Sequence, residues 1–516
     1  MNTPYLNGKF QNEKFQNQKF QNEKYRPQFH FTPSAHWMND PNGMVYFEGE
    51  YHLFYQHHPN GTTWGPMHWG HAVSTDLVHW EHMPIALKPD HNGFIFSGSA
   101  VVDWKDSSGF FGGRPGLVAI FTHADQYPDS DRPRQQQSLA YSSDQGRSWT
   151  MYENNPVLAN ELHTDFRDPK VFWHEQKQHW VMALAAGDHI QFYTSNDLKS
   201  WTFASEFGRA EGSHEGVWEC PDLIELPIEG SEGQRKWVLI VSIGDHPDYP
   251  EGSRTQYFIG QFDGIAFTNE NASDTVLWLD HGRDNYAGVT WSDVERPDQA
   301  KLFIGWMSNW KYCNLTPTKE WRSAMTLPRE LRLRRTPSGI RVVQQPVSEL
   351  QGLRQQEQSR QWGGVTLRPG DNLLKDLKGD RYELICEIDA GGAEEVGFHL
   401  RTSDTEKTVV GYRAAERKLF LCRTDSGESE FHREFACRHD ALLEPFEGRI
   451  RLHLFVDHSS IEIFANDGEI AMTDQIFPDP ASVGLELYAI GGEATIHRLD
   501  FHPLQSIHSY APISRV

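Results

Sequence analysis

Three acidic residues stand in short motifs rich in aromatic and turn-forming residues: Asp40 in HWMNDPNG, Asp168 in FRDPK and Glu219 in GVWECPD. An Asp before Pro most often marks a turn, so each motif alone says little about chemistry. Together they offer the groups needed to cleave a glycosidic bond, where one carboxylate attacks a sugar carbon and another protonates the departing oxygen. We therefore take Asp40, Asp168 and Glu219 as the candidate catalytic set.

Two other patterns suggest different chemistry, and neither is complete. His174-Glu175 followed by His179 is one residue too long for the HExxH zinc motif and lies in an expected strand. Cys220 directly follows Glu219, but no base with an orienting partner is evident, so we expect this thiol to pack beneath Glu219. The sequence predicts no metal site and no cofactor.

The elements that must position the carboxylates have the pattern of strands. Between residues 29 and 335, short apolar runs such as GLVAIFTHAD and HWVMALAAG alternate with clusters of Gly, Asp, Asn and Pro. A turn signal of Ser or Thr followed by Asp recurs and ends at Trp80, Trp149 and Trp201, about 50 to 70 residues apart, the scale of one four-stranded blade. We predict a β-propeller, and a β-sandwich with decorated loops is the structural alternative.

Propeller topology explains how residues so distant in sequence can meet. The innermost strands of successive blades line one central channel. Asp40, Asp168 and Glu219 can converge there if they lie in different blades, which their spacing permits.

The remaining segments differ in composition. Residues 1–28 repeat a KFQNE-like pentad and are too polar to offset the entropy of ordering, so we expect a flexible arm. Residues 336–362 are rich in Arg, Gln and Ser and suit a linker. Residues 363–516 alternate apolar and polar side chains, as in RYELICEID, which predicts half-buried antiparallel strands in a β-sandwich. Helical periodicity is nearly absent, so the expected fold class is all-β.

Charge and composition narrow the partners. The formal net charge of −23 repels phosphate backbones and anionic lipid, so we expect neither nucleic acid nor a membrane as partner, and a neutral ligand such as a sugar fits better. The five cysteines propose no disulfide framework. A cytoplasmic location is favoured because no signal peptide is visible, although a secreted mature form would look the same. The oligomeric state is left open.

Several separated motifs, in order along the chain, give a specific resemblance. WMNDPNG at 37–43, FYQ at 54–56, FSG at 96–98, RDP at 167–169 and WECPD at 218–222 resemble glycoside hydrolase family 32, which includes invertases, inulinases and levanases. The likeness continues through GWM at 305–307 and RSAMTLPRE at 322–330 to DHSSIE at 457–462. The resemblance implies a five-bladed β-propeller with the active site in its central funnel, followed by a β-sandwich.

The resemblance also implies roles for individual residues. Asp40 corresponds to the nucleophile that forms a covalent fructosyl-enzyme, Glu219 to the acid/base and Asp168 to a stabiliser of the transition state. Further positions are expected to contact substrate through amides, hydroxyls and aromatic rings; these are Asn39, Gln56, Trp64, Phe96, Ser97, Arg167 and Trp306. Arg167 suits an ion pair with a carboxylate equally well.

The expected function is hydrolysis, with retention of configuration, that releases terminal β-D-fructosyl units from sucrose, fructo-oligosaccharides, inulin or levan. The first alternative is a fructosyltransferase of the same family, which passes the same intermediate to a sugar instead of water. The second is a non-catalytic fructan-binding protein, and the presence of all three carboxylates argues against it.

Overall fold

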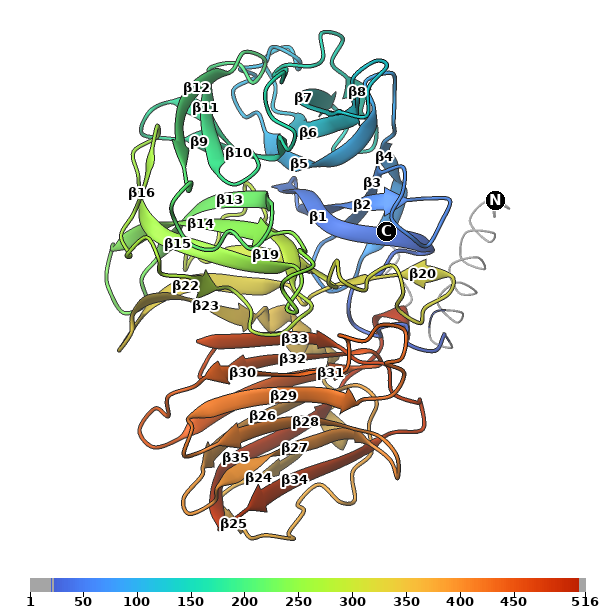
Figure 1. Cartoon of the computed structure of the whole chain (residues 1–516), viewed down its shortest axis with the longest axis vertical. Coiled ribbons are helices and arrows are strands. Elements are labelled where there is room, and N and C mark those ends of the chain that lie inside the picture. The colour runs from blue at the N-terminus through green and yellow to red at the C-terminus, as the bar shows by residue number, and fades with distance from the viewer. Residues whose placement is uncertain (1–19, 21–22, 510–516) are drawn as a thin grey trace, which may run out of the picture. The chain divides into compact units, whose positions relative to one another are not determined.

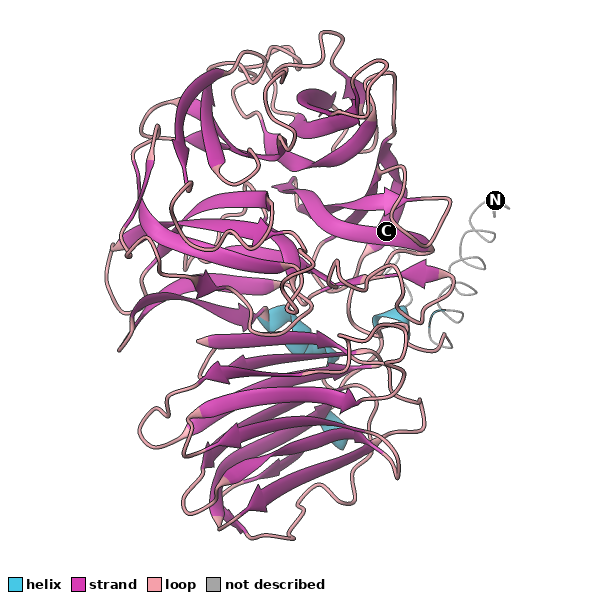
Figure 2. Ribbon diagram, in the orientation of Figure 1, coloured by secondary structure: helices cyan, strands magenta, loops and turns pink. Residues whose placement is uncertain are grey.

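The computed structural model describes residues 20 and 23–509 of the 516-residue chain, and their regular secondary structure is almost entirely β-strand (Figure 2). The chain divides into two compact units. One comprises Pro33–Asn314 and Lys319–Val347; the other comprises the described residues up to Thr32, Leu315–Thr318 and those from Ser348 on. Among the described residues, no helix has the length and apolar character needed to cross a membrane.

The first unit is a five-bladed propeller, with one antiparallel sheet for each blade (Figure 1). The strands of blade 1 are β1 (His36–Phe47), β2 (Glu50–His58), β3 (His68–Ser74) and β4 (Glu81–Leu87). Those of blade 2 are β5 (Phe94–Val102), β6 (Leu117–Gln126), β7 (Pro133–Ser142) and β8 (Thr150–Met151). Those of blade 3 are β9 (Arg167–His174), β10 (His179–Ala185), β11 (Ile190–Ser195) and β12 (Thr202–Phe207).

Blades 4 and 5 complete the circle. The strands of blade 4 are β13 (Trp218–Pro227), β14 (Arg235–Ile243), β15 (Arg254–Phe262), β16 (Phe267–Asn269) and β17 (Leu277–Trp278). Those of blade 5 are β18 (Tyr286–Thr290), β19 (Lys301–Met307), β21 (Ala324–Met325), β22 (Arg329–Thr336) and β23 (Gly339–Pro346). In the chain between β19 and β21, β20 (Trp321–Arg322) pairs in parallel with β1 and so links blade 5 to blade 1.

The first strand of each blade lines the centre of the propeller. β1 contacts β5, β5 contacts β9, β9 contacts β13, β13 contacts β18, and β18 contacts β1. Apolar side chains fill the spaces between neighbouring blades; Val118 and Ile120 of blade 2, for example, share a core with Val171 and Met182 of blade 3. The predicted propeller is therefore confirmed, and its innermost strands form the ring that positions the catalytic candidates.

The recurring turn signal has the predicted local role. Asp76 accepts hydrogen bonds from the N–H groups of Val78 and His79, and the Trp80 indole N–H donates to the carbonyl of Leu77 at 3.0 Å. The turns that end at Trp149 and Trp201 repeat this pattern, with their indoles donating to Gly146 and Leu198. The carboxylate satisfies backbone donors while the ring covers the turn.

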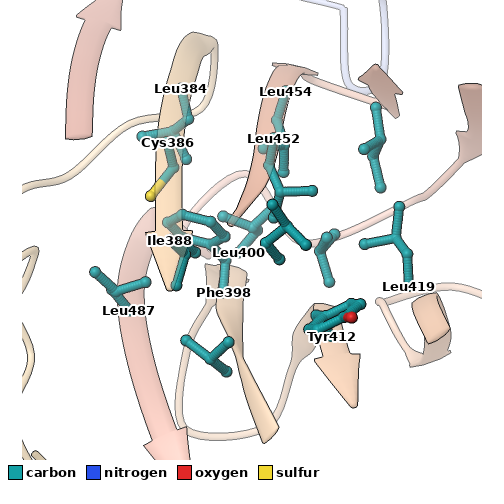
Figure 3. Packing of buried hydrophobic residues seen from close by; sticks show 14 of the residues in the cluster. Leu384, Cys386, Ile388, Phe398, Leu400, Tyr412, Leu419, Leu452, Leu454 and Leu487 are labelled. Atoms are coloured by element: carbon teal, nitrogen blue, oxygen red, sulfur yellow. The ribbon is translucent and has the colours of Figure 1, made fainter. Parts of the chain in front are cut away.

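The second unit is a sandwich of two antiparallel sheets. The larger sheet contains β24 (Arg360–Trp362), β25 (Val365–Leu367), β26 (Tyr382–Asp389), β31 (Ile450–Asp457), β32 (Ser460–Ala465), β33 (Ile470–Gln475) and β35 (Ala494–Pro503). The smaller contains β27 (Glu395–Thr402), β28 (Lys407–Arg413), β29 (Lys418–Asp425), β30 (Arg438–Leu442) and β34 (Gly484–Ile490). Alternate residues of both sheets, such as Leu384, Phe398 and Leu454, form the core of the sandwich (Figure 3).

The predicted linker at 336–362 is mostly regular structure. β23 is the outer strand of blade 5, and the 3-10 helices η1 (Ser348–Leu353) and η2 (Gln356–Gln358) lead into β24; a third, η3 (Ile507–Ser509), ends the described chain. Only the middle residues of β23 are buried. Its polar composition therefore reflects an exposed position in the blade, which the sequence pattern did not distinguish from a linker.

The segment that precedes the propeller packs on the sandwich unit. Tyr25 is buried, and the N–H of Gln28 donates to both carboxylate oxygens of Asp457 at 2.8 and 2.9 Å. The ring nitrogens of His30 lie 2.8 Å from Asp457 and 2.9 Å from Glu462. The pKa of Asp457 is lowered, so this acceptor is ionised, and hydrogen bonds to an ionised carboxylate are stronger than those between neutral groups.

This packing bears on the expected flexible arm at 1–28. Residues 1–19 and 21–22 of that arm lie outside the described residues. From residue 23 on, the structure differs from the expectation, because Tyr25 and Arg26 bury their side chains and Gln28 finds a buried carboxylate partner. The sequence pattern did not reveal this packing, because the polar composition of the repeat continues into residues 23–28.

Candidate active site

All five innermost strands of the propeller are irregular near one end. Register shifts fall between Met38 and Pro41 in β1 and between Glu219 and Asp222 in β13. Similar shifts occur in β5 and β18, and in β10 opposite the start of β9. Such bulges re-aim side chains and are frequent beside active sites. The bulges direct side chains of the sequence motifs toward the centre of the propeller.

The prolines of the motifs explain why the bulges form there. Pro41, Pro169 and Pro221 have no N–H to donate to a neighbouring strand, so a strand accepts them at an edge or a bulge. Asp168 and Cys220 also adopt left-handed backbone conformations, with φ of 64° and 46°. The Asp-Pro pairs therefore mark strand bulges in this fold, where the general rule suggested turns.

The three predicted carboxylates come together, and Cys220 lies between Asp40 and Asp168. The Cys220 N–H donates to Oδ2 of Asp168 at 3.0 Å. Its Sγ lies 3.5 Å from the same oxygen and 3.7 Å from Oδ2 of Asp40. The Ser97 hydroxyl donates to that Asp40 oxygen at 3.3 Å. Blades 1, 2, 3 and 4 each contribute a group to this cluster.

Glu219 is held from two sides. Arg167 donates from Nε at 3.1 Å and from Nη2 at 2.7 Å to Oε1, while the Tyr286 hydroxyl donates to Oε2. The Arg167 guanidinium also pairs with Asp165 and lies 3.9 Å from Asp168. Of the two roles that the sequence left open for Arg167, the ion pair with a carboxylate is the one seen.

Burial and mutual repulsion raise the pKa values of two of the acids. The pKa of Asp40 rises to about 7, because its carboxyl is desolvated and lies near the charges of Glu219 and Asp168. Desolvation also raises the pKa of Asp168 to about 6, although Arg167 opposes the shift. For Arg167, desolvation is outweighed by the neighbouring carboxylates, so its pKa is raised and it stays charged.

The predicted substrate contacts comprise polar side chains near Asp40 and three aromatic residues. Asn39 and Ser97 lie beside Asp40; the Asn39 side-chain carbonyl accepts the indole N–H of Trp37 at 2.7 Å. Gln56 does not contact Asp40 directly; its side-chain amide donates to Asn42 at 2.8 Å.

Trp64 and Phe96 form the aromatic group. Their rings meet edge to face at a centroid distance of 6.1 Å. Trp64 is 45% exposed and is tethered through its N–H to Asn314 at 2.9 Å. These rings can offer an apolar surface to a sugar ring.

Trp306 is the third aromatic residue among the predicted substrate contacts. Its side chain is fully buried among Trp37, Trp310 and Tyr286, with ring centroids 6.2, 4.9 and 6.3 Å away. With no exposed ring face in this structure, Trp306 offers no stacking surface, and its contact with substrate stays a prediction. Its ring packs edge to face against that of Tyr286.

No pattern in the sequence singles out Tyr286 as a site residue. It lies at the start of β18 in the short run DNYAG, which has no distinctive spacing or composition. Only the knowledge that β18 is an innermost strand, with a bulge between Tyr286 and Val289, could have placed its hydroxyl at the site.

Comparisons with known proteins agree with this geometry. The model for the glycosyl hydrolases family 32 N-terminal domain matches residues 30–346, and the model for the C-terminal domain of the same family matches residues 349–503. The chain is 53% identical over 493 residues to a levanase of Bacillus subtilis (strain 168), covering 94% of this chain and 71% of that protein.

Two solved structures extend the comparison. The exo-inulinase from Aspergillus awamori matches with a TM-score of 0.86 and 38% identity, over 94% of this chain and 99% of that one. A β-fructofuranosidase from Schwanniomyces occidentalis in complex with fructosyl-erythritol matches with a TM-score of 0.83 and 32% identity, over 93% and 98% of the two chains.

Proposed function

Because the chain belongs to glycoside hydrolase family 32, we propose that Asp40, Glu219 and Asp168 cleave its substrates by a double displacement with retention of configuration. The protein is a glycosidase of the β-fructofuranosidase and exo-fructanase type, which releases fructosyl units from fructans and sucrose. The observation that supports the assignment of residues is the convergence of three carboxylates on the innermost strands β1, β9 and β13.

In the first half of the reaction, the ionised carboxylate of Asp40 attacks the anomeric carbon of the terminal fructosyl unit. Glu219 donates its proton to the glycosidic oxygen as that bond breaks, leaving a covalent fructosyl ester on Asp40. The hydrogen bond from Ser97 fixes the Asp40 carboxylate in the orientation needed for attack.

In the second half, Glu219 acts as a base. It takes a proton from water, the water oxygen attacks the anomeric carbon, and Asp40 leaves as a carboxylate. Arg167 and Tyr286 hold the two oxygens of Glu219 from opposite sides, so the same side chain remains positioned through both steps.

Asp168 takes part without a covalent bond. Its Oδ2 is fixed by the N–H of Cys220, and its other oxygen is available for sugar hydroxyls. Positive charge develops on the fructosyl ring in the transition state, and hydrogen bonds from the sugar to a fixed carboxylate strengthen as it does.

We place levan first among the donors, because the similar Bacillus protein is a levanase. Values of kcat/KM for levan, inulin and sucrose, with timed product analysis, test this order. Fructose should be the only early product from levan and inulin, and sucrose should give fructose and glucose. A higher kcat/KM for inulin or sucrose than for levan would contradict the order.

The same assay separates hydrolysis from fructosyl transfer. At high sucrose concentration, a hydrolase releases fructose and glucose in nearly equal amounts. Lengthening oligosaccharides, with glucose in large excess over fructose, would identify a transferase that uses the same covalent intermediate.

A further inference from the structure

A pocket of about 460 Å³ lies in the propeller, toward the ends of the innermost strands that are opposite to the three carboxylates. Asp40, Asp168 and Glu219 lie in the first halves of their strands. The pocket is lined by later residues of β5, β9 and β13, including Val102 and Trp173, and by the residues that follow β18. We call it the distal pocket. Its volume lies within the range of small-molecule sites.

The distal pocket is separate from the carboxylate cluster. Between them lies a cavity of about 10 Å³, lined by Asp168, Cys220, Lys170 and Thr290 among others, which has room for about one water molecule. Lys170 and Thr290 line both spaces, and the Lys170 ammonium donates to the Thr290 carbonyl at 2.8 Å. A substrate in the active site therefore does not reach the distal pocket.

Aromatic rings form much of the distal pocket's wall. Three of the indole N–H groups already have partners: Trp104 donates to Asp293 at 2.9 Å, Trp173 to Glu175 at 2.8 Å and Trp291 to the His52 carbonyl at 3.0 Å. These side chains therefore present ring surface and no free donor. Trp104 is 57% exposed, so the wall continues to the protein surface.

The cations that line the distal pocket fall into two kinds. Lys170 lies 3.2 Å from Asp222, Arg235 lies 2.8 Å from Glu225, and Lys105 donates to the Gln178 side chain at 3.2 Å. Lys301 is the exception, because within residues 20 and 23–509 no hydrogen bond or ion pair of its ammonium group is found.

The surroundings of Lys301 are unfavourable for a lone positive charge. Desolvation lowers the pKa of Lys301, and the charges of Lys170 and Arg235 lower it further, although Asp222 and Asp293 oppose the shift. A partly buried ammonium without a partner costs free energy, and an anion bound beside it would offset that cost. The unpartnered ammonium of Lys301 thus favours a negatively charged ligand over a neutral one beside it.

We propose that the distal pocket binds a compact organic anion, a carboxylate or phosphate carried on a ring with an apolar face. Lys301 pairs with the anionic group, and the rings of Trp104 and Trp173 contact the body of the ligand. This site is independent of fructosyl transfer at Asp40.

Isothermal titration calorimetry of the full chain with three probes tests the proposal. Benzoate and glucose 6-phosphate represent the two sources of an anionic ring, and glucose is the neutral control. We expect at least one anion to bind with a single site, and glucose to bind at least tenfold more weakly. Whether benzoate or glucose 6-phosphate binds shows whether the anionic group is a carboxylate or a phosphate. Binding of neither anion overturns the proposal.

Variants locate the site. Lys301→Gln should weaken anion binding at least tenfold, whereas Lys88→Gln, at an exposed lysine of the same propeller, should change it less than twofold. Both should hydrolyse sucrose at the wild-type rate, which verifies folding. Trp104→Ala is a second variant, because its ring is exposed, and should weaken binding at least fivefold. If glucose binds as tightly as the anion and Lys301→Gln has no effect, the pocket is a neutral sugar site and the proposal is overturned. Unchanged anion binding in Trp104→Ala would also overturn it.

Discussion

The thiol of Cys220 bridges the proposed nucleophile and the proposed stabiliser, with Sγ 3.7 Å from Oδ2 of Asp40 and 3.5 Å from Oδ2 of Asp168. Burial, with the charges of both residues and of Glu219, raises the pKa of this thiol well above its ordinary value, so it stays protonated. One S–H can donate to only one oxygen at a time. Cys220 is therefore a positioning residue that links two carboxylates of like charge.

Removing this thiol should have a measurable but limited effect. In Cys220→Ala the N–H bond to Asp168 persists, and only one weak side-chain donor is lost, so we expect kcat to fall about 2- to 10-fold. Steady-state kinetics with sucrose measure this, with Cys422→Ala in the sandwich as the matched control. An unchanged kcat would show that the thiol does not position either carboxylate.

Loss of the Tyr286 hydroxyl should mainly affect kcat. Tyr286→Phe removes the bond to Oε2 of Glu219, and a hydrogen bond to a charged group is worth about 1.5 to 3 kcal/mol, so kcat should fall about 10- to 100-fold. The control is Tyr193→Phe, which removes a phenol hydroxyl bonded to Gln191 in blade 3. Equal losses in the two variants would point to a structural role only.

The pH profile should report the crowded carboxylates. Asp40 must be ionised to attack, and its pKa is raised to about 7, so kcat/KM should fall as the pH drops through a value well above that of an ordinary aspartate. Asp168→Asn removes one of the charges that raise this pKa. We expect that variant to lose about 100- to 1000-fold in kcat and to shift its acid limb to lower pH. An unshifted acid limb would contradict the electrostatic coupling.

The same pKa shift predicts a pH-dependent stability. The pKa of Asp40 is raised by folding from 3.8 to about 7, so the folded state is favoured below pH 3.8 and this contribution is lost as the pH rises through 7. At pH 8 the free energy of unfolding of Asp40→Asn should therefore exceed that of the wild type by on the order of 2 to 4 kcal/mol, and its unfolding temperature should be higher. The gap should close toward pH 4.

Calorimetry at both pH values measures this difference. Asp129→Asn, at an exposed position of the same propeller, is the control and should show no comparable gain. A gain in Asp40→Asn that is equal at pH 4 and pH 8 would show that repulsion among the carboxylates is not its cause.

Much of this arrangement could be predicted from the sequence, because it depends on local patterns. The Asp and Trp of each repeated turn act within a few residues, and so Asp76 and Trp80 have the predicted contacts. Asp40, Asp168 and Glu219 stand in motifs with a distinctive composition, and the propeller supplies the reason for their convergence.

Other features depend on partners far away in the chain and could not be predicted. Tyr286 reaches Glu219 only because a bulge in β18 turns it inward, and the rings that bury Trp306 include that of Trp37 in β1. The segment at Tyr25 is polar on average, yet it is ordered by Asp457, more than 400 residues later. Composition carries no signal for any of these contacts.

The acid and base roles of Glu219 can be separated with a substrate that needs no protonation. Glu219→Ala should lose about 100- to 10,000-fold in activity on sucrose, but formation of the fructosyl-enzyme from β-fructosyl fluoride should be much less impaired, because fluoride leaves without a proton. Azide, a nucleophile that needs no base, should restore turnover of the fluoride. Equal loss on both substrates without azide rescue would contradict the assigned role.

The most direct test of the proposed mechanism is to trap the intermediate. Glu219→Gln treated with β-fructosyl fluoride should accumulate the ester, because no base remains to activate water. Peptide mass spectrometry after rapid acid quenching locates the sugar. We predict a single fructosyl adduct on the peptide that contains Asp40. An adduct on Asp168 instead, or no adduct while fructose is released with inverted configuration, would contradict the double displacement at Asp40.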